Sequence, residues 1–527
     1  MKARFTLFAA ALLAAGVAQA QTLRWASQGD VQTLDPVSQN ESFTNAFNGQ
    51  IYDFLVARDK KLGIVPSLAT EWKQEGPLKW VFKLRQGVKF HDGRPFTADD
   101  VVFSLNRSKE KTSQISNYAN ALGEARKIDD HTVEFNLKQF NPIFLEHLNT
   151  VYILSKSWCE EHKVTKPQDF TNKEETYTAR NANGTGPYML VSRQPDVKTV
   201  LKRNPDYWGG KLEGNVQEVV YTPVASAPTR TAALISGELD FILDPPVADL
   251  ERLRNTPGVK VIEGLENRVI FIGMDQARDE LLYSSVKGKN PFKDVRVRRA
   301  LYQSIDIDTI KNKIMNGQAI PTGAVVPSPV GSFNDPDIER RLPYDLNAAR
   351  KLMAEAGYPD GFEVTLDCPN NRYINDERIC IALANMWAQL KVKVKVNAMP
   401  KSTYFPKQEK LDTSMYMLGW GGSTLDPEVT FTPIYRNRAS GGVGEYNRGN
   451  YKDDELDALA AASSKEVDPA KRKELIKKTF LRHNEQVHHI PLHRQFIPWA
   501  SRTNVEVVHR ADNWLEIQWV KVKDTSK

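Results

Sequence analysis

The sequence predicts a mixed α/β fold, because strand and helix signals alternate along most of the chain. Apolar and polar residues alternate in "KWVFKL" (79–84) and "HTVEFNL" (131–137), as they do in half-buried strands. "YDLNAARKLMAEAGYP" (344–359) begins at an Asp cap, carries an apolar face with helical spacing and ends at Gly and Pro, which predicts a helix. A second such helix (375–391) leads directly into a strand of alternating Lys and Val, so this part of the chain predicts an αβ unit.

Two further segments extend the same interpretation. "FTADDVVFSLNR" (96–107) places Thr97 at a helix start with Asp100 three residues on, as in a capping box. Residues 453–487 predict two helices that break near Asp468-Pro469. The sequence contains no internal repeat and no long linker rich in Pro, Gly or Ser. The domains are therefore expected to be joined by more than one crossing of the chain.

Residues 1–20 predict a secretory signal peptide. Lys2 and Arg4 precede an apolar run (5–17), and Ala18-Gln19-Ala20 supplies small residues at a cleavage site before Gln21. No Cys follows this site, and no later stretch is long and apolar enough to cross a bilayer. We expect an exported, soluble chain without a lipid anchor. An uncleaved anchor is the alternative, and the shortness of the apolar run argues against it.

Size and charge narrow the class of partner. The 527 residues carry a formal charge of +6, which is mild for a chain long enough for about two to four domains. Lys391, Lys393 and Lys395 alternate with valines, which predicts the solvated face of a strand and not a basic patch. The sequence therefore gives no reason to expect a nucleic-acid partner.

The three cysteines suggest one disulfide. Cys368 and Cys380 lie 12 positions apart, whereas Cys159 stands alone. Export makes a bridge between Cys368 and Cys380 chemically permissible, and we favour it over two buried free thiols. Cys159 is expected to remain an unpaired thiol.

Motifs of catalysis and metal binding are absent from the sequence. It contains neither G-x-S-x-G nor H-E-x-x-H. His488, His489 and His493 are close in "HHIPLH", but neighbours on a strand point to opposite faces, so they do not easily converge on a metal. We expect no enzyme activity, no metal and no cofactor.

"MLGWGGSTLDP" (417–427) places glycines around a tryptophan. One explanation is a tight turn that holds a core Trp. The other is a site where the backbone approaches a bound molecule, because glycine permits close approach. The motif itself leaves both open.

A longer set of motifs resembles a known family. "LATEWKQEGPLKWVFKLRQGVKFHDGRPFTADDVVFSL" (68–105) is similar to the signature region of family 5 periplasmic solute-binding proteins, the dipeptide, oligopeptide and nickel-type receptors of ABC importers. Further fragments match in the same order over nearly all of the chain after residue 20: "GTGPYML" from Gly184, "RNPDYWGG" from Arg203, "LISGELDFI" from Leu234, "FKDVRVRRALYQSID" from Phe292, "YKDDELDALAAAS" from Tyr451 and "HIPLHRQ" from His489.

The resemblance implies a two-lobed periplasmic-binding-protein fold of type II, in the large peptide-receptor subclass. It also implies an extra domain inserted in the N-terminal lobe and a hinged ligand cleft. The expected division is lobe I at 21–50, 183–270 and 490–527, inserted domain II at 51–182, and lobe III at 271–489. A monomeric receptor in the periplasm of a Gram-negative type of cell is expected to pass its ligand to inner-membrane permease subunits, without catalysing a reaction.

The resemblance also implies site residues. Gly419, Trp420, Gly421 and Gly422 match a segment that lines the cleft and pairs its backbone with an extended peptide. Ser423 stands where peptide receptors have an Asp that binds the ligand's ammonium group, so binding of a free amine is in question.

Two other segments complete the expected site. Arg372 and Tyr373 match the segment whose Arg holds the ligand carboxylate, although Arg372 could instead pair with Asp376. Glu41 and Ser42 match the first cleft-lining loop. Our hypothesis is that Glu41 supplies the negative charge that Ser423 lacks.

The favoured function is capture of a peptide or a peptide-like organic anion. Alternatives within the family are a metal chelate, a modified amino acid or a saccharide. Alternatives from other classes are an exported hydrolase and a chaperone-like binder of unfolded chains. The sequence does not identify the ligand.

Overall fold

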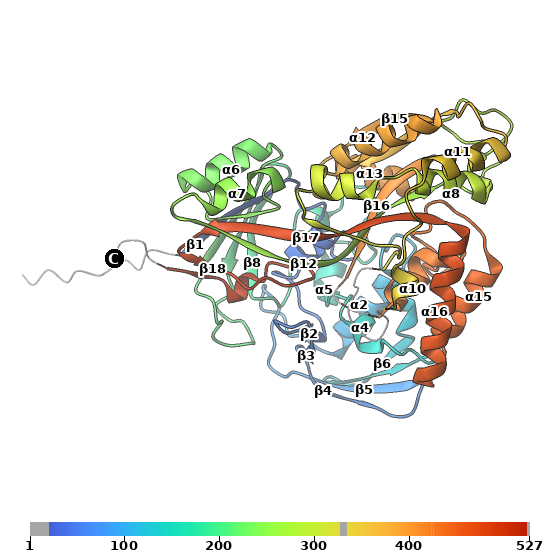
Figure 1. Cartoon of the computed structure of the whole chain (residues 1–527). Helices are drawn as coiled ribbons and strands as arrows, with labels where there is room; N and C mark the ends of the chain where they lie inside the picture. Colours follow the sequence, from blue (N-terminus) through green and yellow to red (C-terminus); the bar gives the residue numbers. More distant parts are fainter. Residues whose placement is uncertain (1–20, 327–334, 423, 425, 524–527) are drawn as a thin grey trace, which may run out of the picture.

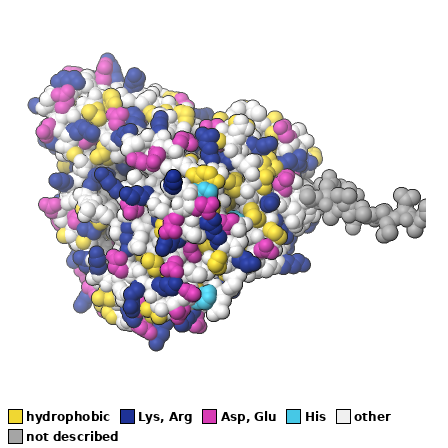
Figure 2. Space-filling model, turned by 180° about the vertical axis from the view of Figure 1, so that it is seen from behind, with side chains coloured by type: hydrophobic (Ala, Val, Ile, Leu, Met, Phe, Trp, Pro, Cys, Tyr) yellow, Lys and Arg dark blue, Asp and Glu magenta, His cyan; other side chains and the backbone are white. Residues whose placement is uncertain are grey.

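The computed structural model describes residues 21–326, 335–422, 424 and 426–523. The predicted signal peptide (1–20) and Ser423 lie outside the described residues. No helix in the described ranges is long and apolar enough to cross a membrane. Figure 2 shows Lys and Arg side chains interspersed with Asp and Glu on one face of the molecule, so that face carries no broad field of one sign.

An 11-stranded sheet forms the centre of the molecule, in the order β15-β14-β16-β12-β17-β11-β1-β10-β9-β8, with β13 paired to β17. Its strands are β1 (Thr22–Ser27), β8 (Tyr188–Gln194), β9 (Lys198–Arg203), β10 (Glu218–Pro223), β11 (Phe241–Leu243), β12 (Val259–Met274), β13 (Ala319–Pro321), β14 (Glu363–Pro369), β15 (Lys393–Met399), β16 (Met415–Gly421) and β17 (His489–Arg502).

The strands β12 and β17 hold the two halves of this sheet together. They pair antiparallel from Val259↔Arg502 to Gly273↔His489, with register shifts after Leu265. Figure 1 shows them running side by side through the middle of the molecule, with α6 and α7 toward one end and α11 and α12 toward the other. Any relative motion of the two ends therefore bends these strands.

A four-stranded sheet, β4-β5-β7-β6, lies apart from the central sheet. Its alternating apolar residues face a core of their own, in which Phe82, Val133 and Phe135 are at most 1% exposed. The predicted strands 79–84 and 131–137 are confirmed as β5 and β7. This sheet and the short pair beside it comprise β2 (Val56–Arg58), β3 (Ile64–Pro66), β4 (Ala69–Gln74), β5 (Lys79–Leu84), β6 (Glu124–Asp129) and β7 (Thr132–Asn136), and a further short pair is β18 (Val505–Glu506) with β19 (Lys521–Val522).

Local capping signals set several helix starts. The Asp100 carboxylate accepts the backbone N–H of Thr97 at 2.9 Å, which confirms the capping box at the start of α2. The helices of the first half are α1 (Ser42–Asn48), α2 (Ala98–Ser108), α3 (Ser116–Ala121), α4 (Phe144–Leu148), α5 (Lys156–Glu161), α6 (Ala227–Ser236) and α7 (Leu250–Arg254).

In the second half, the predicted αβ unit is confirmed, because α12 leads through a short turn into β15. A disulfide joins Cys368 in β14 to Cys380 in α12, and Cys159 is a buried free thiol. The helices here are α8 (Val295–Gln303), α9 (Ile307–Thr309), α10 (Pro336–Glu339), α11 (Leu346–Glu355), α12 (Asp376–Trp387), α13 (Lys401–Glu409), α14 (Glu428–Thr430), α15 (Asp454–Ser463) and α16 (Pro469–Gln486).

Candidate ligand-binding site

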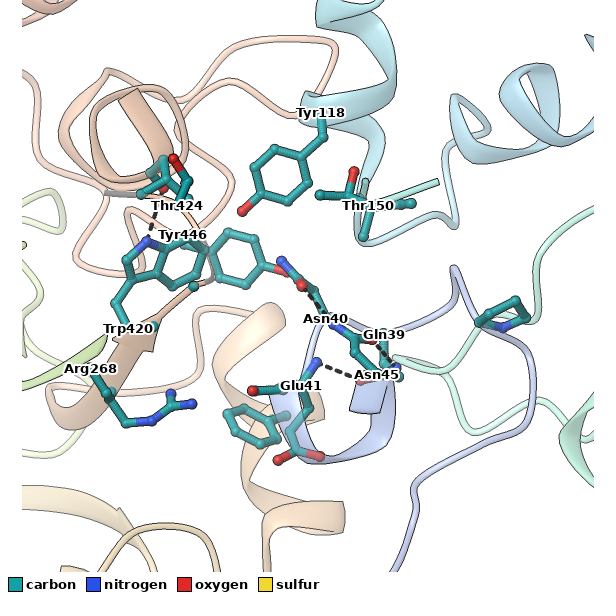
Figure 3. A pocket seen from close by; sticks show the side chains of 18 of the residues that line it. Gln39, Asn40, Glu41, Asn45, Tyr118, Thr150, Arg268, Trp420, Thr424 and Tyr446 are labelled. Atoms are coloured by element: carbon teal, nitrogen blue, oxygen red, sulfur yellow. Dashed lines mark hydrogen bonds between the residues drawn. The ribbon is translucent and has the colours of Figure 1, made fainter. Parts of the chain in front are cut away.

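A cavity of about 160 Å³, measured as the volume open to the centre of a water molecule, lies between the N-terminal segments and the second half of the chain. Three parts of the chain that are far apart in sequence surround it. Figure 3 shows Gln39, Asn40, Glu41 and Asn45 from the loop and helix at α1, Tyr118 from α3 and Thr150 after α4, and Arg268, Trp420, Thr424 and Tyr446 from the second half.

The strand β16 offers backbone groups to this cavity. It pairs with β12 over its whole length, and the Gly422 N–H donates to the Asn267 carbonyl at 3.2 Å. Because backbone groups of successive residues alternate in direction, Gly419 and Gly421 point theirs away from β12. On that side the pairing with β14 stops at Tyr416. Beyond it the Tyr373 hydroxyl donates to the Gly419 carbonyl at 3.4 Å.

Two glycines of the "GWGG" segment make room for other atoms of the protein itself. A Cβ on Gly419 would lie 2.5 Å from Cε1 of Tyr373. A Cβ on Gly421 would lie 2.9 Å from the Asn267 carbonyl oxygen and 3.0 Å from the Arg268 guanidinium carbon. Gly422 differs, because its nearest neighbour would be a Val429 methyl at 3.6 Å. All three glycines line the cavity.

Trp420 is a core residue and a wall of the cavity at once. It is 6% exposed, and its indole N–H donates to the Val429 carbonyl at 2.9 Å. Its ring packs on that of Tyr446 with centroids 4.8 Å apart, and both rings line the cavity (Figure 3). The two explanations offered by the sequence therefore do not exclude each other.

Glu41 is the centre of a buried ion cluster. It is the N-cap of α1, where its carboxylate accepts the Thr44 N–H at 2.9 Å and the Thr44 hydroxyl at 2.8 Å. It also accepts the Phe43 N–H at 3.3 Å, and it pairs with the Arg372 Nε at 2.7 Å and the Lys401 Nζ at 3.2 Å. Burial alone would raise the pKa of Glu41, but the two cations and Thr44 outweigh it and lower the pKa to about 2. The Glu41 charge is thus already balanced by the protein.

Arg372 pairs with Glu41 and not with Asp376. The Asp376 carboxylate instead accepts the backbone N–H groups of Arg372 and Tyr373, each at 2.9 Å. The side chains of Arg372, Tyr373 and Ser42 line the cavity together with Glu41. The structure therefore brings the sequence-predicted residues together, apart from Ser423, which lies outside the described residues.

Sequence reasoning missed several polar residues of the cavity wall. Arg268 lies on β12 and its Nε donates to Glu266 at 2.7 Å. Gln408 and Glu409 come from α13, and Arg448 follows Tyr446. None belongs to a motif that predicts ligand contact, so only their position in the fold reveals them.

The histidines of "HHIPLH" lie outside the cavity wall. His488 contacts Asp453 at 3.0 Å and His489 contacts His483 at 2.9 Å. Burial lowers the pKa of His489 and of His493 to about 3. The part of the chain that the structure describes contains no group of three or more His, Cys, Asp or Glu placed to hold a metal ion.

Comparison with solved structures supports the fold. The chain superposes on the periplasmic binding protein DppA from Helicobacter pylori in complex with the peptide STSA, with a TM-score of 0.85 at 23% identity, covering 95% of this chain and 98% of that one. It superposes on NikZ from Campylobacter jejuni in complex with Ni(L-His) with a TM-score of 0.78 at 20% identity, covering 92% and 94%. The expected periplasmic-binding-protein fold is confirmed.

Sequence comparison identifies the family. The chain is 28% identical over 507 residues to heme-binding protein A of Haemophilus influenzae, covering 87% of each, and 28% identical over 472 residues to the dipeptide-binding protein of Escherichia coli K12, covering 84% of each. These relatives are binding proteins. Residues 63–442 match the family model for bacterial extracellular solute-binding proteins, family 5. The chain therefore belongs to family 5 of the bacterial extracellular solute-binding proteins.

Proposed function

We propose that this chain is the periplasmic receptor of an ABC importer and that it captures a peptide or peptide-like solute for an inner-membrane permease. Family membership supports a binding role without catalysis. The names of similar proteins, which include dipeptide-binding and glutathione-binding proteins, favour ligands with peptide bonds. A cleaved signal peptide (1–20), no lipid anchor and a monomeric state complete the proposal.

The edge of β16 beyond its pairing with β14 is the observation that supports this proposal. Backbone N–H and C=O groups on a strand edge can pair with an extended peptide whatever its side chains are. Gly419 and Gly421 direct such groups away from β12, at residues that line the cavity. Trp420 and Tyr446 add an apolar wall beside that edge. A solute with peptide bonds matches both features.

The charges favour an anionic end group over an ammonium group. A ligand ammonium at Glu41 would compete with Arg372 and Lys401, which already contact both carboxylate oxygens. The Glu41 cluster itself carries one more cation than anion. Arg372, which the sequence predicts to hold a carboxylate, is itself paired with Glu41, so an anionic end group calls for a further cation of the cavity wall.

The proposed division into lobes is consistent with contacts around the cavity. The Tyr446 hydroxyl donates to the Gln114 carbonyl at 3.0 Å, and Thr171 donates to Glu409. These contacts join proposed domain II to lobe III, and the Glu41 cluster joins lobe I to lobe III. We propose that they form when the lobes approach and that β12 and β17 form the hinge. The proposed units are lobe I (21–50, 183–270, 490–527), domain II (51–182) and lobe III (271–489).

Native mass spectrometry of the protein purified from its own periplasm, before and after mild denaturation, tests this function. A discrete peptide or peptide-like mass released on denaturation is the expected result. Release of a metal chelate or a sugar would show that the ligand is not a peptide but another class of solute. Turnover of an added peptide into fragments would overturn the binding-protein assignment.

A further inference from the structure

One end of the cavity holds a buried amide without a partner. Gln408, on α13, is 1% exposed and lines the cavity. Neither its amide nitrogen nor its amide oxygen forms a hydrogen bond within the part of the chain that the structure describes. Buried side-chain amides are almost always hydrogen-bonded, because leaving them unpaired costs free energy. An unpaired Gln in a cavity wall therefore indicates that something else binds there.

Arg448 lines the cavity too. Its charge opposes the rise in the pKa of Glu409, the residue after Gln408 on α13, so Arg448 lies near that end of the helix. It is 5% exposed, and its guanidinium lies 4.8 Å from the centroid of the Tyr446 ring. Its side chain makes no hydrogen bond or ion pair with any other residue in the described ranges. By contrast, Arg58, Arg268 and Arg372 also line the cavity and each pairs with a glutamate.

The acids near Arg448 do not form an ion pair with it. Burial raises the pKa of Glu409, and it raises the pKa of Glu445 to about 7, while the charge of Arg448 opposes both shifts. Glu409 accepts a hydrogen bond from Thr171. The neighbouring cation, Arg438, donates to the backbone carbonyl of Glu445. Arg448 thus lines the cavity without an ion pair to either acid within the described residues.

We propose that Gln408 and Arg448 form a subsite for the carboxylate end of the ligand, in which Arg448 holds the carboxylate and Gln408 pairs with the adjoining amide group. A guanidinium fork matches a carboxylate in two parallel hydrogen bonds. A Gln side chain offers a donor and an acceptor, as a peptide bond does. The inference rests on the proposed function and deepens it: the ligand class is an acyl amino acid or a peptide C-terminus, anchored at Arg448 instead of Arg372.

The surroundings of the subsite suit this ligand. Phe405 lies one turn before Gln408 on the same face of α13 and also lines the cavity. Tyr446 lies beside Trp420 in the wall (Figure 3). Apolar walls exclude water and so strengthen a charge-assisted hydrogen bond. A C-terminal residue with an apolar side chain would contact these rings.

Two matched peptide pools test the subsite. Both contain tripeptides of Gly, Ala, Leu and Phe with free N-termini. The peptides of one pool have a free C-terminal carboxylate, and those of the other pool have a C-terminal amide. Full-length mature protein, freed of captured solute by mild denaturation and refolding, is mixed with each pool and the retained masses are read by native mass spectrometry. The variants are R448Q, Q408L and the control K410Q, which removes an exposed cation from the residue after α13.

The expected result is retention of acids over amides by the wild type and by K410Q. R448Q is expected to weaken retention of acids by about tenfold or more, the value of a lost charge-assisted hydrogen bond. Q408L is expected to weaken it while the Tm of the ligand-free protein stays level or rises, because Leu removes an unpaired buried amide. This second variant keeps the test decisive if R448Q folds poorly.

Three results would overturn the inference. Equal retention of acids and amides by the wild type would show that no subsite recognises the carboxylate, while the proposed capture of peptides would still hold. Undiminished retention of acids by R448Q and Q408L would place the anchor elsewhere. Retention of neither pool by the wild type would count against the proposed peptide ligand itself.

Discussion

Replacing Glu41 with Gln is expected to destabilise the folded protein by about 3 kcal/mol at pH 7. Glu41 neutralises two buried cations, Arg372 and Lys401. Its pKa falls from 4.5 to about 2 on folding, and a difference of about 2.5 pH units corresponds to about 3 kcal/mol. Removing one member of a buried ion pair independently costs about 3–5 kcal/mol. The two magnitudes agree.

The stabilisation that Glu41 contributes is expected to decrease in acid. Because the folded pKa lies below the unfolded value, the stabilisation is complete above pH 4.5 and disappears as the pH falls through about 2. Between pH 4.5 and pH 2 the unfolded wild type takes up a proton at Glu41 while the folded protein stays mostly ionised there, and E41Q does not titrate at this position. The stability difference between the two proteins should therefore narrow by about 1.4 kcal/mol between pH 7 and pH 3.5.

Urea unfolding of ligand-free protein, followed by circular dichroism at both pH values, measures this difference. The matched control is E71Q, which removes an exposed carboxylate on β4 and should change stability by less than about 0.5 kcal/mol. A loss below about 1 kcal/mol for E41Q at pH 7 would refute the reasoning, and so would a difference that stays constant in acid. Either result would leave Glu41 available for a ligand.

Three other perturbations have expected outcomes. G419A should cost about 1–3 kcal/mol in urea unfolding, because its Cβ would lie 2.5 Å from the Tyr373 ring, whereas G422A should cost less than 1 kcal/mol; equal costs would contradict this packing. C368S, which opens the loop of 12 positions closed by the disulfide, should cost about 3 kcal/mol, and dithiothreitol should cost the wild type the same. Cys159 is fully buried and burial raises its pKa to about 12, so it should react with a thiol reagent only after unfolding.

Patterns among neighbouring residues predicted the framework of the fold. The alternation in 79–84 and the caps at Thr97 and Asp345 are local properties, and β5, α2 and α11 occupy those places. The cavity depends on residues far apart in sequence: Glu41 and Lys401 are separated by 360 positions. Local patterns carry no information on such a pair.

Gln408 and Arg448 were missed for a related reason. Pro406 lies inside α13, where a proline argues against a helix, so the pattern does not place Gln408 on a face. Arg448 lies within the Gly-rich segment 441–449, which predicts only a loop. Resemblance to the family could not supply them either, because it transfers only residues in matching motifs.

The glycines beside Trp420 bear on how a ligand would be bound, by pairing with the backbone of β16 or by hydrogen bonds to side chains. Tyr373 packs against Gly419, and the backbone of Asn267 and the side chain of Arg268 pack against Gly421. A Gly-rich motif therefore shows that something approaches the backbone but not that it is a ligand. On β16 a ligand can pair with backbone N–H and C=O groups of the strand edge, and such pairing does not depend on the side chains of the peptide. Discrimination must then come from side chains with unused hydrogen-bonding capacity, because groups already paired within the protein gain little from a ligand. Gln408 and Arg448 meet that condition and Glu41 does not, so selectivity is expected at the α13 end of the cavity.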